Sequence, residues 1–322
     1  MDFFQIILWP FKWVMSWILG AFHTVLELVG MDPDSGFTWT LSIILLVVLV
    51  RTLLIPLFVK QIKSQRAMQA LQPDIKKLQA KYKGKTDQLS RQAMAMEQQA
   101  LFKEHGTSPF AACLPMLVQM PFFFALFQIL TGAGAAAERG EGEAALTADQ
   151  IRSFGDAIFL GAPMQATFLG SVGENLNIAV IMVSVVMIIL MSGSQFFMQK
   201  MLMSKNMSEA AMTGPFAQSQ KFMLYILPLV FGIGGINFPI GVLIYWTATN
   251  FWAVAQQMWI IRNNPTPGSL AEQELNERRA VKGLPPVGKA AQEAAAKAEI
   301  EAAKPQQTGQ RQQPKRKTKK RR

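Results

Sequence analysis

The chain has 322 residues, half of them hydrophobic, with 32 Lys and Arg against 21 Asp and Glu. The apolar residues form long runs and the basic residues lie between and after them, which is typical of a polytopic membrane protein and excludes a uniform soluble domain. A single cysteine, Cys113, excludes an intrachain disulfide. The two histidines, His23 and His105, lie on distant segments, so we predict no metal site and no cofactor.

Residues 1–36 contain an apolar run from Phe3 to Val29 with one narrow polar stripe. The stripe consists of Gln5, Lys12, Ser16, His23 and Glu27, at successive spacings of 7, 4, 7 and 4. Tryptophans at positions 9, 13 and 17 are typical of a membrane interface. We predict an amphipathic helix on the outer leaflet, and the alternative is a sixth span with a polar seam.

Residues 37–262 form the predicted core, because five runs are long enough to cross the hydrocarbon region as helices. They are Phe37–Val59, Pro109–Thr131, Asn177–Met198, Phe222–Phe238 and Ile240–Ile261. The last two runs are joined by a tight turn at Pro239. The predicted fold class is therefore an all-α polytopic membrane protein with a five-helix transmembrane core.

Loop charges predict the orientation of these spans. Residues 60–104 hold 10 basic and 4 acidic residues, whereas 132–175 hold 2 basic and 6 acidic residues. The positive-inside rule places the first loop in the cytoplasm and the second outside. We predict a multi-pass protein of the cell (plasma or inner) membrane with a cytoplasmic C-terminus, and a short helix in the outer loop 132–175.

The cytoplasmic segment 60–108 is predicted to be a helical hairpin. Two apolar series with helical spacing are separated by Gly84 as breaker, with Thr86 or Asp87 as N-cap. The first series is Met68, Leu71, Ile75, Leu78 and Tyr82, and the second is Leu89, Ala93, Met96 and Ala100. We expect the two series to face each other as one apolar seam.

Residues 263–322 change to Ala, Gln, Glu, Pro and Lys with almost no large apolar residues, which predicts a disordered tail. The last eight positions hold seven basic residues, including Lys315, Arg316 and Lys317. Such a tail suits ribosomal RNA, which binds through salt-dependent phosphate contacts. The alternative partner is the anionic inner leaflet.

Arg51 lies inside the first predicted span, three residues from its middle and about 4–5 Å along a helix axis. A charged residue near a helix centre costs roughly 2.5–3.5 kcal/mol on insertion. No predicted span holds an Asp or Glu near its middle that could pair with it. Arg51 therefore either snorkels to the interface or faces a wet cavity that can accept an anion from another molecule.

Polar side chains on three other spans can form the rest of such a cavity, because intramembrane polar groups face the bundle interior or water. Ordinary hydrogen bonding between helices is the simpler explanation for each of them alone. They are Gln119 on the second span, Asn177, Ser184, Ser192, Gln195 and Gln199 on the third, and Thr249, Asn250, Gln256 and Gln257 on the fifth.

No nucleotide-binding loop, nucleophile elbow, zinc-protease motif or carboxylate pair is present in the sequence, so we expect no enzymatic activity. Four blocks in order carry a resemblance instead: Val50–Leu57, Met68–Leu78, His105–Leu126, and Ile244–Asn250 with the following Gln256-Gln257. On these blocks the chain resembles the YidC-type membrane protein insertases (the YidC/Oxa/Alb family). Its compact length is similar to that of Gram-positive and actinobacterial members.

The resemblance implies a hydrophilic intramembrane groove that is open to the cytoplasm and closed outside, with Arg51 as its positive residue. It implies insertion and chaperoning of nascent membrane proteins without nucleotide hydrolysis, alone or with a Sec translocon. The predicted groove residues are Arg51, Gln119, Phe123, Ser184, Gln195, Tyr245, Trp246 and Asn250. The predicted cytoplasmic recruitment residues are Lys76, Lys77 and Lys81 on the hairpin and Lys315, Arg316 and Lys317 in the tail.

The alternative functions are a transporter or channel and an assembly scaffold for membrane complexes. A transporter or channel would need a midplane solute site and often internal repeats, and the sequence shows no repeat and no intramembrane acid for cation coupling. An assembly scaffold for membrane complexes is compatible with insertion, and the sequence does not separate the two. We therefore expect nascent membrane proteins, the lipid bilayer and the ribosome as partners.

Overall fold

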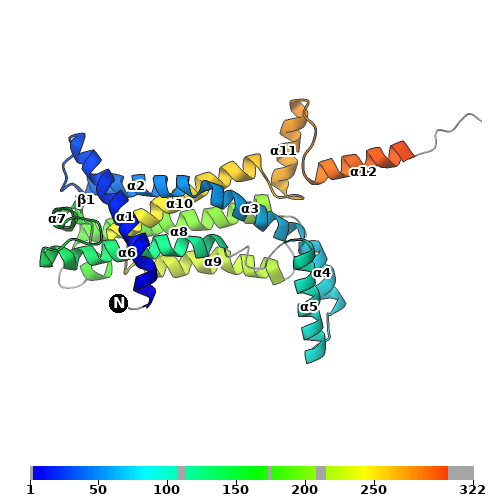
Figure 1. Ribbon diagram of the computed structural model, residues 1–322, viewed down its shortest axis with the longest axis horizontal. Coiled ribbons are helices and arrows are strands. Elements are labelled where there is room, and N and C mark those ends of the chain that lie inside the picture. The colour runs from blue at the N-terminus through cyan, green and yellow to red at the C-terminus, as the bar shows by residue number, and fades with distance from the viewer. Residues whose placement is uncertain (1–2, 107–113, 173–175, 208–214, 304–322) are drawn as a thin grey trace, which may run out of the picture.

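The computed structural model describes residues 3–106, 114–172, 176–207 and 215–303. Five long helices lie along one another in a bundle (Figure 1). They are α2 (Gly36–Leu53), α6 (Leu114–Arg139), α8 (Ile178–Asn206), α9 (Pro215–Gly235) and α10 (Ile240–Asn263). Helix α8 packs against both α9 and α10, and α10 also packs against α2. The all-α character of the fold is confirmed.

Four helices of the described chain are long and apolar enough to cross a membrane. They contain Gln5–Leu28, Gly36–Leu53, Leu117–Arg139 and Ile178–Asn206. Helices α9 and α10 form where we predicted the fourth and fifth spans, but they are not in this set. Both carry Gln residues, with Gly in α9 and Thr and Asn in α10, which lower their hydropathy.

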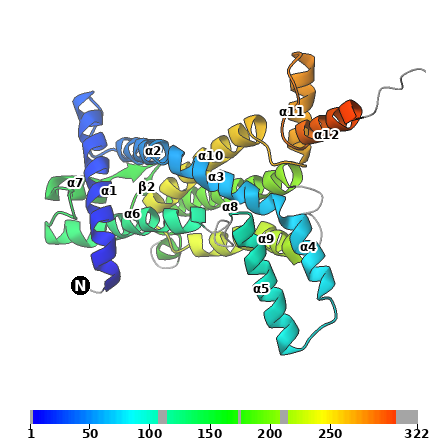
Figure 2. The same ribbon diagram turned by 45° about the vertical axis from the view of Figure 1, so that its right-hand side comes forward.

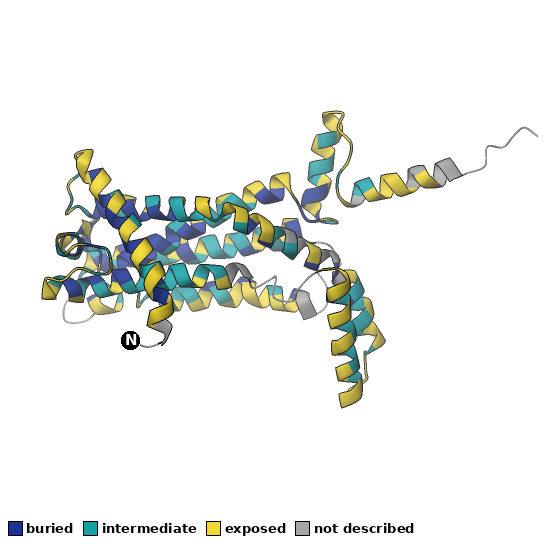
Figure 3. Ribbon diagram, in the orientation of Figure 1, coloured by how far each residue is buried: buried dark blue, intermediate teal, exposed yellow. Residues whose placement is uncertain are grey.

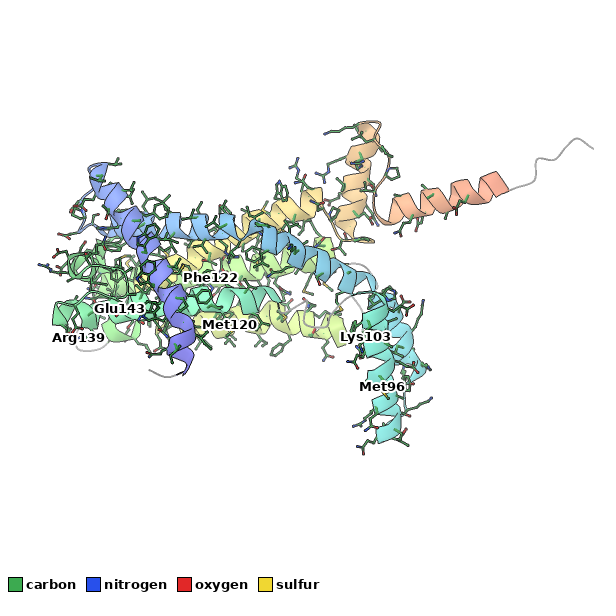
Figure 4. The ribbon with its side chains drawn as sticks, in the orientation of Figure 1. Met96, Lys103, Met120, Phe122, Arg139 and Glu143 are labelled. Carbon is green, nitrogen blue, oxygen red and sulfur yellow. The ribbon has the colours of Figure 1, made fainter. Side chains whose placement is uncertain are left out.

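Helix α1 (Phe3–Leu28) runs steeply across one end of the bundle instead of along it, in both views (Figures 1 and 2). It packs against α2 and α6. Figure 4 shows Phe122 and Glu143 close to it. Phe122 makes an edge-to-face contact with Phe11 at 5.4 Å between ring centroids, and Glu143 forms an ion pair with Lys12.

The middle of the polar stripe of α1 (Lys12, Ser16 and His23) faces protein, whereas Gln5 and Glu27 at its ends are exposed. Besides the Lys12 ion pair, the Ser16 Oγ accepts a hydrogen bond from the Ala145 backbone N–H at 2.9 Å, and the His23 ring contacts the Pro33 carbonyl at 3.0 Å. Trp9, Trp13 and Trp17 are exposed on the other side. The exposed face of α1 is therefore apolar, and its polar groups fasten it to the loops at this end.

The segment between α6 and α8 covers the same end of the bundle. It holds α7 (Ala148–Asp156), the antiparallel strands β1 (Ile158–Phe159) and β2 (Ala162–Pro163), and the 3₁₀ helix η2 (Leu169–Ser171). The predicted short helix is present as α7, which starts with a capping box between Thr147 and Gln150.

The main core lies under this covering segment. Trp39 is fully buried and donates a hydrogen bond from its Nε1 to the Ser153 Oγ at 3.1 Å, while its ring meets Phe154 edge-to-face. Leu126, Ile129 and Ile151 complete the densest part of the core. Figure 3 shows buried residues concentrated at the end of the bundle next to α1 and α7. Packed side chains thus fill this end.

At the opposite end the chain forms α3 (Ile55–Ala70), α4 (Gln72–Lys81) and α5 (Gln88–Glu104), with α4 and α5 antiparallel (Figure 1). The break between α3 and α4 falls at Leu71, where Pro73 in the first turn of α4 cannot continue the preceding helix. Met68, Leu71 and Ile75 are buried together with Phe102, as the first predicted series requires.

The second predicted series does not face the first one, so the prediction of a single apolar seam is wrong for α5. Leu89 is 77% exposed and Met96 is 64% exposed, and Ala100 is exposed as well. Helix α5 is rotated so that Phe102 and Leu101 pack on the α3–α4 cluster, while Glu97 turns toward Lys81 and Tyr82. The rotation follows the larger apolar side chain, because burying Phe102 gains more than burying two alanines.

Residues 263–303 differ from the predicted disorder. They form α11 (Leu270–Val281) and α12 (Lys289–Ala303), and α11 packs against α8 and α10. The Thr266 N–H donates to the Asn206 Oδ1 at 2.9 Å, and Lys205 pairs with Glu274 at 3.1 Å. Polar contacts to α8 stabilise α11, and the Ala-rich sequence of α12 favours a helix. The prediction of disorder was wrong here because it considered only the lack of large apolar residues.

The predicted N-cap of α5 offers a test of local stability. Asp87 accepts a hydrogen bond from the Ser90 N–H at 2.8 Å, and this bond lowers the pKa of the Asp87 carboxyl. We expect Asp87→Ala to cost about 1 kcal/mol of helix stability, or roughly fivefold faster amide exchange in the first turn of α5. Hydrogen–deuterium exchange measures this, and unchanged exchange would contradict the capping role. Thr86→Ala is the matched control, because Asp87 and not Thr86 is the N-cap of α5.

Candidate functional site

Arg51 lies in the last turn of α2, just before a break in the helix. Leu54 ends α2, and α3 begins with Ile55 and Pro56, whose ring nitrogen cannot donate to the Thr52 carbonyl. The predicted continuous span over Phe37–Val59 is therefore two helices. The unbonded carbonyls at a helix C-terminus carry partial negative charge, so this position lowers the energy of a cation.

The guanidinium of Arg51 has aromatic neighbours. Its Cζ lies 5.3 Å from the centroid of the Phe58 ring, within the range of a cation–π contact. It also interacts electrostatically with the Tyr245 hydroxyl. Among the described residues, no carboxylate forms an ion pair with Arg51. The half-buried charge is therefore available to an anion that another molecule supplies.

Gln119 and Tyr245 connect α6 to α10 beside this arginine. The Gln119 Nε2 donates to the Tyr245 hydroxyl oxygen at 3.2 Å, and the Tyr245 side chain is buried. The Gln119 Oε1 is also buried and has no partner among the described groups. One amide thus holds the tyrosine while its carbonyl remains free to accept a hydrogen bond.

An aromatic cluster continues from Tyr245 toward the filled end of the bundle. Phe123 stacks on Tyr245 at 6.3 Å and meets Trp246 edge-to-face at 4.9 Å between centroids. Trp246 also contacts Phe231 at 4.8 Å and Phe238 at 5.7 Å. These rings come from α6, α9, α10 and the turn before α10, so the cluster forms an apolar boundary next to the polar group of Arg51, Gln119 and Tyr245.

Several buried polar atoms near the bundle axis have no hydrogen-bond partner among the described protein groups. They belong to Gln61 on α3, Gln119 on α6, Ser184 on α8 and Thr247 on α10. Leaving such a group dry costs about 1–3 kcal/mol each. Water is the partner that removes this cost, so these side chains favour a hydrated interior.

Of the predicted groove residues, the structure places Gln119, Phe123, Tyr245 and Trp246 in mutual contact, next to Arg51. It uses Asn250 differently, because the Asn250 Nδ2 donates to the Met191 carbonyl at 3.1 Å and ties α10 to α8. Ser184 is fully buried on α8 and has no hydrogen-bond partner among the described residues, and Gln195 is half-buried further along the same helix.

The polar face of α8 serves more than one purpose. Asn177 caps the helix by accepting from the Val180 N–H, and the Gln199 Nε2 donates to the Gln220 Oε1 of α9 at 2.8 Å. The simpler explanation, hydrogen bonding within and between helices, thus holds for these residues. It also holds for Gln256 on α10, which accepts from the Trp252 indole N–H.

Phe58 and Gln61 were missed by the sequence analysis. Phe58 follows Arg51 by seven residues, a spacing that places two side chains on the same helix face, so the signal was present. Gln61 is 2% exposed, and it was assigned to the cytoplasmic loop because it sits among basic residues. Its burial depends on the bend between α2 and α3, which periodicity does not predict.

The hairpin lysines predicted for recruitment have partners inside the hairpin. Lys77 pairs with Asp74 at 2.9 Å, Lys81 pairs with Glu97 at 2.7 Å, and Lys76 also has an interaction partner. The hydrogen bond from Lys81, with a second from Tyr82, lowers the pKa of the Glu97 carboxyl. Lys315, Arg316 and Lys317 lie outside the described residues.

Together these features define the class of protein: an all-α polytopic membrane protein with an unpaired arginine beside a polar and aromatic cluster inside its bundle. Residues 30–267 match the model of the 60Kd inner membrane protein family. The chain belongs to this family, the YidC-type membrane protein insertases.

Actinobacterial relatives share most of the chain. A "Membrane protein insertase YidC" of Streptomyces avermitilis is 45% identical over 82% of this chain, which spans 60% of that protein's length. The protein of the same name from Tropheryma whipplei is 39% identical over 86% of this chain and 90% of its own length. The protein of the same name from Bifidobacterium longum is 36% identical over 98% of this chain and 94% of its own length.

The contact between Asn250 and α8 can be tested by stability. We expect Asn250→Ala to lower the free energy of unfolding by about 0.5–1.5 kcal/mol, because the hydrogen bond between α10 and α8 is lost while the Ser194 hydroxyl still donates to the Met191 carbonyl. Thermal unfolding of the purified protein in detergent measures this as a lower Tm. Gln195→Ala is the matched control, and equal Tm values for both variants would contradict the structural role of Asn250.

Proposed function

We propose that this chain inserts nascent membrane proteins through a hydrated groove that starts at the cytoplasmic end of the bundle. The single observation that carries the proposal is Arg51, a half-buried cation with no described acidic partner beside Gln119 and Tyr245. Membership of the insertase family and its similarity to relatives named membrane protein insertases support it.

The position of the core supports an opening on one side only. Packed residues around Trp39 and Phe154 fill the end covered by α1 and α7. The unpartnered polar atoms of Gln61, Gln119 and Thr247 lie on helices that continue toward the hairpin end. Loop charges place the hairpin in the cytoplasm, so the groove opens to the compartment where nascent chains emerge.

The mechanism needs no nucleotide. A short hydrophilic segment of the substrate enters the groove, where water and Arg51 lower the cost of desolvating its polar groups. An acidic substrate residue pairs transiently with the guanidinium by a charge-assisted hydrogen bond. Burial of the substrate's apolar segment in lipid, worth roughly 25 cal/mol per Å² of apolar area, drives the step to completion.

The packing of the bundle favours one exit for the substrate. Helices α8 and α10 pack closely along their lengths, and Asn250 bonds across them, so passage between them would break this contact. Helices α6 and α9 have little direct packing with each other. We therefore place the lateral exit between α6 and α9, next to the aromatic cluster of Phe123, Phe231 and Trp246.

The membrane topology completes the proposal. Helices α2, α6, α8, α9 and α10 cross the membrane, and both the hairpin and the C-terminus lie in the cytoplasm. Helix α1 then lies along the outer surface, because it runs across the bundle and exposes Trp9, Trp13 and Trp17 to the lipid interface.

Removal of the charge tests the groove. With a substrate that has an acidic residue in its translocated segment, we expect Arg51→Ala to reduce insertion at least about tenfold, since a charge-assisted hydrogen bond contributes roughly 1.5–3 kcal/mol. Arg51→Lys should keep most of the activity. Insertion into proteoliposomes, scored by protease protection, measures both.

The matched substrate control replaces the acidic residue by its amide. Its insertion should depend less on Arg51, because the amide cannot form the charged pair. Full insertion of the acidic substrate by Arg51→Ala would contradict the role of the charge. Solute flux through liposomes that hold the purified protein would instead favour a channel or transporter.

We also propose the ribosome as a partner of the basic C-terminal residues. Helix α12 extends away from the bundle on the side of the hairpin (Figure 1), and its 15 residues span about 22 Å. The basic residues 315–322 follow α12 in the sequence, and their high charge density suits the salt-dependent phosphate contacts of RNA. We therefore favour ribosomal RNA over inner-leaflet lipid.

A truncation after Ala303 tests this partner and keeps α11 and α12 intact. We expect ribosome co-sedimentation of the truncated protein to fall, and the binding of the full chain to weaken steeply with added salt. The control is binding of both proteins to anionic vesicles, which should change little. Unchanged co-sedimentation after truncation would contradict the proposal.

A further inference from the structure

The bend between α2 and α3 opens a wedge against α10. Helix α2 packs along α10, but α3 departs from this direction after Leu54 and Pro56 and makes little contact with α10. The gap is a cavity of about 300 Å³. Ile55, Val59 and Ile62 line one wall, and Trp252, Trp259 and Ile260 line the other. We call this cavity the α3–α10 slot.

The lining of the slot favours an apolar occupant. Its volume is about ten times the roughly 30 Å³ that one water molecule occupies in the liquid, but apolar cavities do not hold water stably. The slot lies on the outside of the bundle, between helices that face lipid. An acyl chain is the apolar group that the membrane supplies there at high concentration.

Two arginines lie beyond the end of the slot that Trp259 and Ile260 line. Arg262 follows Trp259 by three residues, so it continues the same face of α10 about 4.5 Å further along the axis. The Arg278 Nη2 donates to the Arg262 carbonyl oxygen at 2.7 Å. Both side chains are exposed, and neither forms an ion pair with a described carboxylate.

Helix α11 supplies the second arginine because it is docked on the bundle. The contacts of Thr266 with Asn206 and of Glu274 with Lys205 fix α11 against the end of α8. Arg278 is thereby held beside Arg262, although the family match ends at residue 267. Two guanidiniums next to an apolar slot complement the phosphate and the acyl chain of one lipid molecule.

We propose that the α3–α10 slot binds one anionic phospholipid of the cytoplasmic leaflet, with an acyl chain between Val59 and Trp259 and the phosphate at Arg262 and Arg278. The bound chain fills the wedge that the bend at Pro56 leaves open. The choice of the cytoplasmic leaflet rests on the membrane topology proposed above, but lipid binding itself is independent of substrate insertion, so its test needs no nascent chain.

The test uses fluorescence quenching by brominated lipids. The full chain is reconstituted in phosphatidylcholine vesicles with increasing fractions of dibrominated phosphatidylglycerol or dibrominated phosphatidylcholine. The difference between the unchanged protein and Trp259→Phe isolates the Trp259 signal. We expect phosphatidylglycerol to quench Trp259 at a several-fold lower mole fraction than phosphatidylcholine.

Variants separate the two halves of the site. Arg262→Gln and Arg278→Gln should each lower the preference for phosphatidylglycerol about fivefold, the factor for one cation near a membrane surface. Lys282→Gln removes the same charge from the end of α11 and should change nothing. Ala255→Phe fills the slot from its exposed edge and should reduce quenching by both lipids.

Three outcomes would overturn the proposal. Equal quenching by the two lipids would show an ordinary annular position without a headgroup site. A preference that survives the double Arg262→Gln, Arg278→Gln variant, or that falls equally with Lys282→Gln, would assign it to general surface charge. Unchanged quenching in Ala255→Phe would place the acyl chain elsewhere. Thermal unfolding of each variant verifies that α11 remains docked.

Discussion

The arrangement of this protein depends on one charged side chain at the end of a broken helix. Arg51 lies in the last turn of α2, and Pro56 prevents the helix from continuing unchanged into α3. The break gives the guanidinium a helix C-terminus and the Phe58 ring as neighbours, instead of a carboxylate. The charge is made tolerable without being neutralised, and it therefore stays available to a visiting anion.

The same break shapes the periphery of the molecule. Because α3 bends away from α10, the α3–α10 slot opens on the lipid side while Gln61 is buried on the other. Helix α11 then closes over the ends of α8 and α10 and brings Arg278 to Arg262, beyond the end of the slot. A polar interior and a lipid-facing wedge thus have one local cause, the missing backbone donor of a proline.

The filled end of the bundle complements this open end. Trp39, Ser153 and Pro33 are linked by hydrogen bonds, and α1 is fastened over them by Lys12, Ser16 and His23. Most of these polar groups have hydrogen-bond partners within the protein, with the buried His23 Nδ1 as an exception among the described groups, so this end needs less water. The unpartnered groups of Gln119, Ser184 and Thr247 do need it. The bundle is therefore closed by packed residues at one end and favours water at the other.

The sequence by itself determined features that depend on neighbouring residues. Apolar runs located the helices, loop charges predicted their orientation, and Gly84 and Asp87 marked the hairpin turn, because length, charge and capping are local properties. The same holds for Arg51, whose cost in lipid is evident without a structure. The four ordered blocks of residues were sufficient to recognise the family.

Only the tertiary structure decided which faces meet. It paired Gln119 with Tyr245, gave Asn250 to the Met191 carbonyl, left Leu89 and Met96 exposed, and docked α11 through Thr266 and Asn206. Each outcome depends on how one helix is rotated against another, and a periodic pattern of apolar residues leaves that rotation undetermined. The physical reason is packing. Burial of large side chains such as Phe102 and Trp246 contributes most of the free energy and therefore sets the rotation, and smaller polar residues form the contacts that this rotation allows.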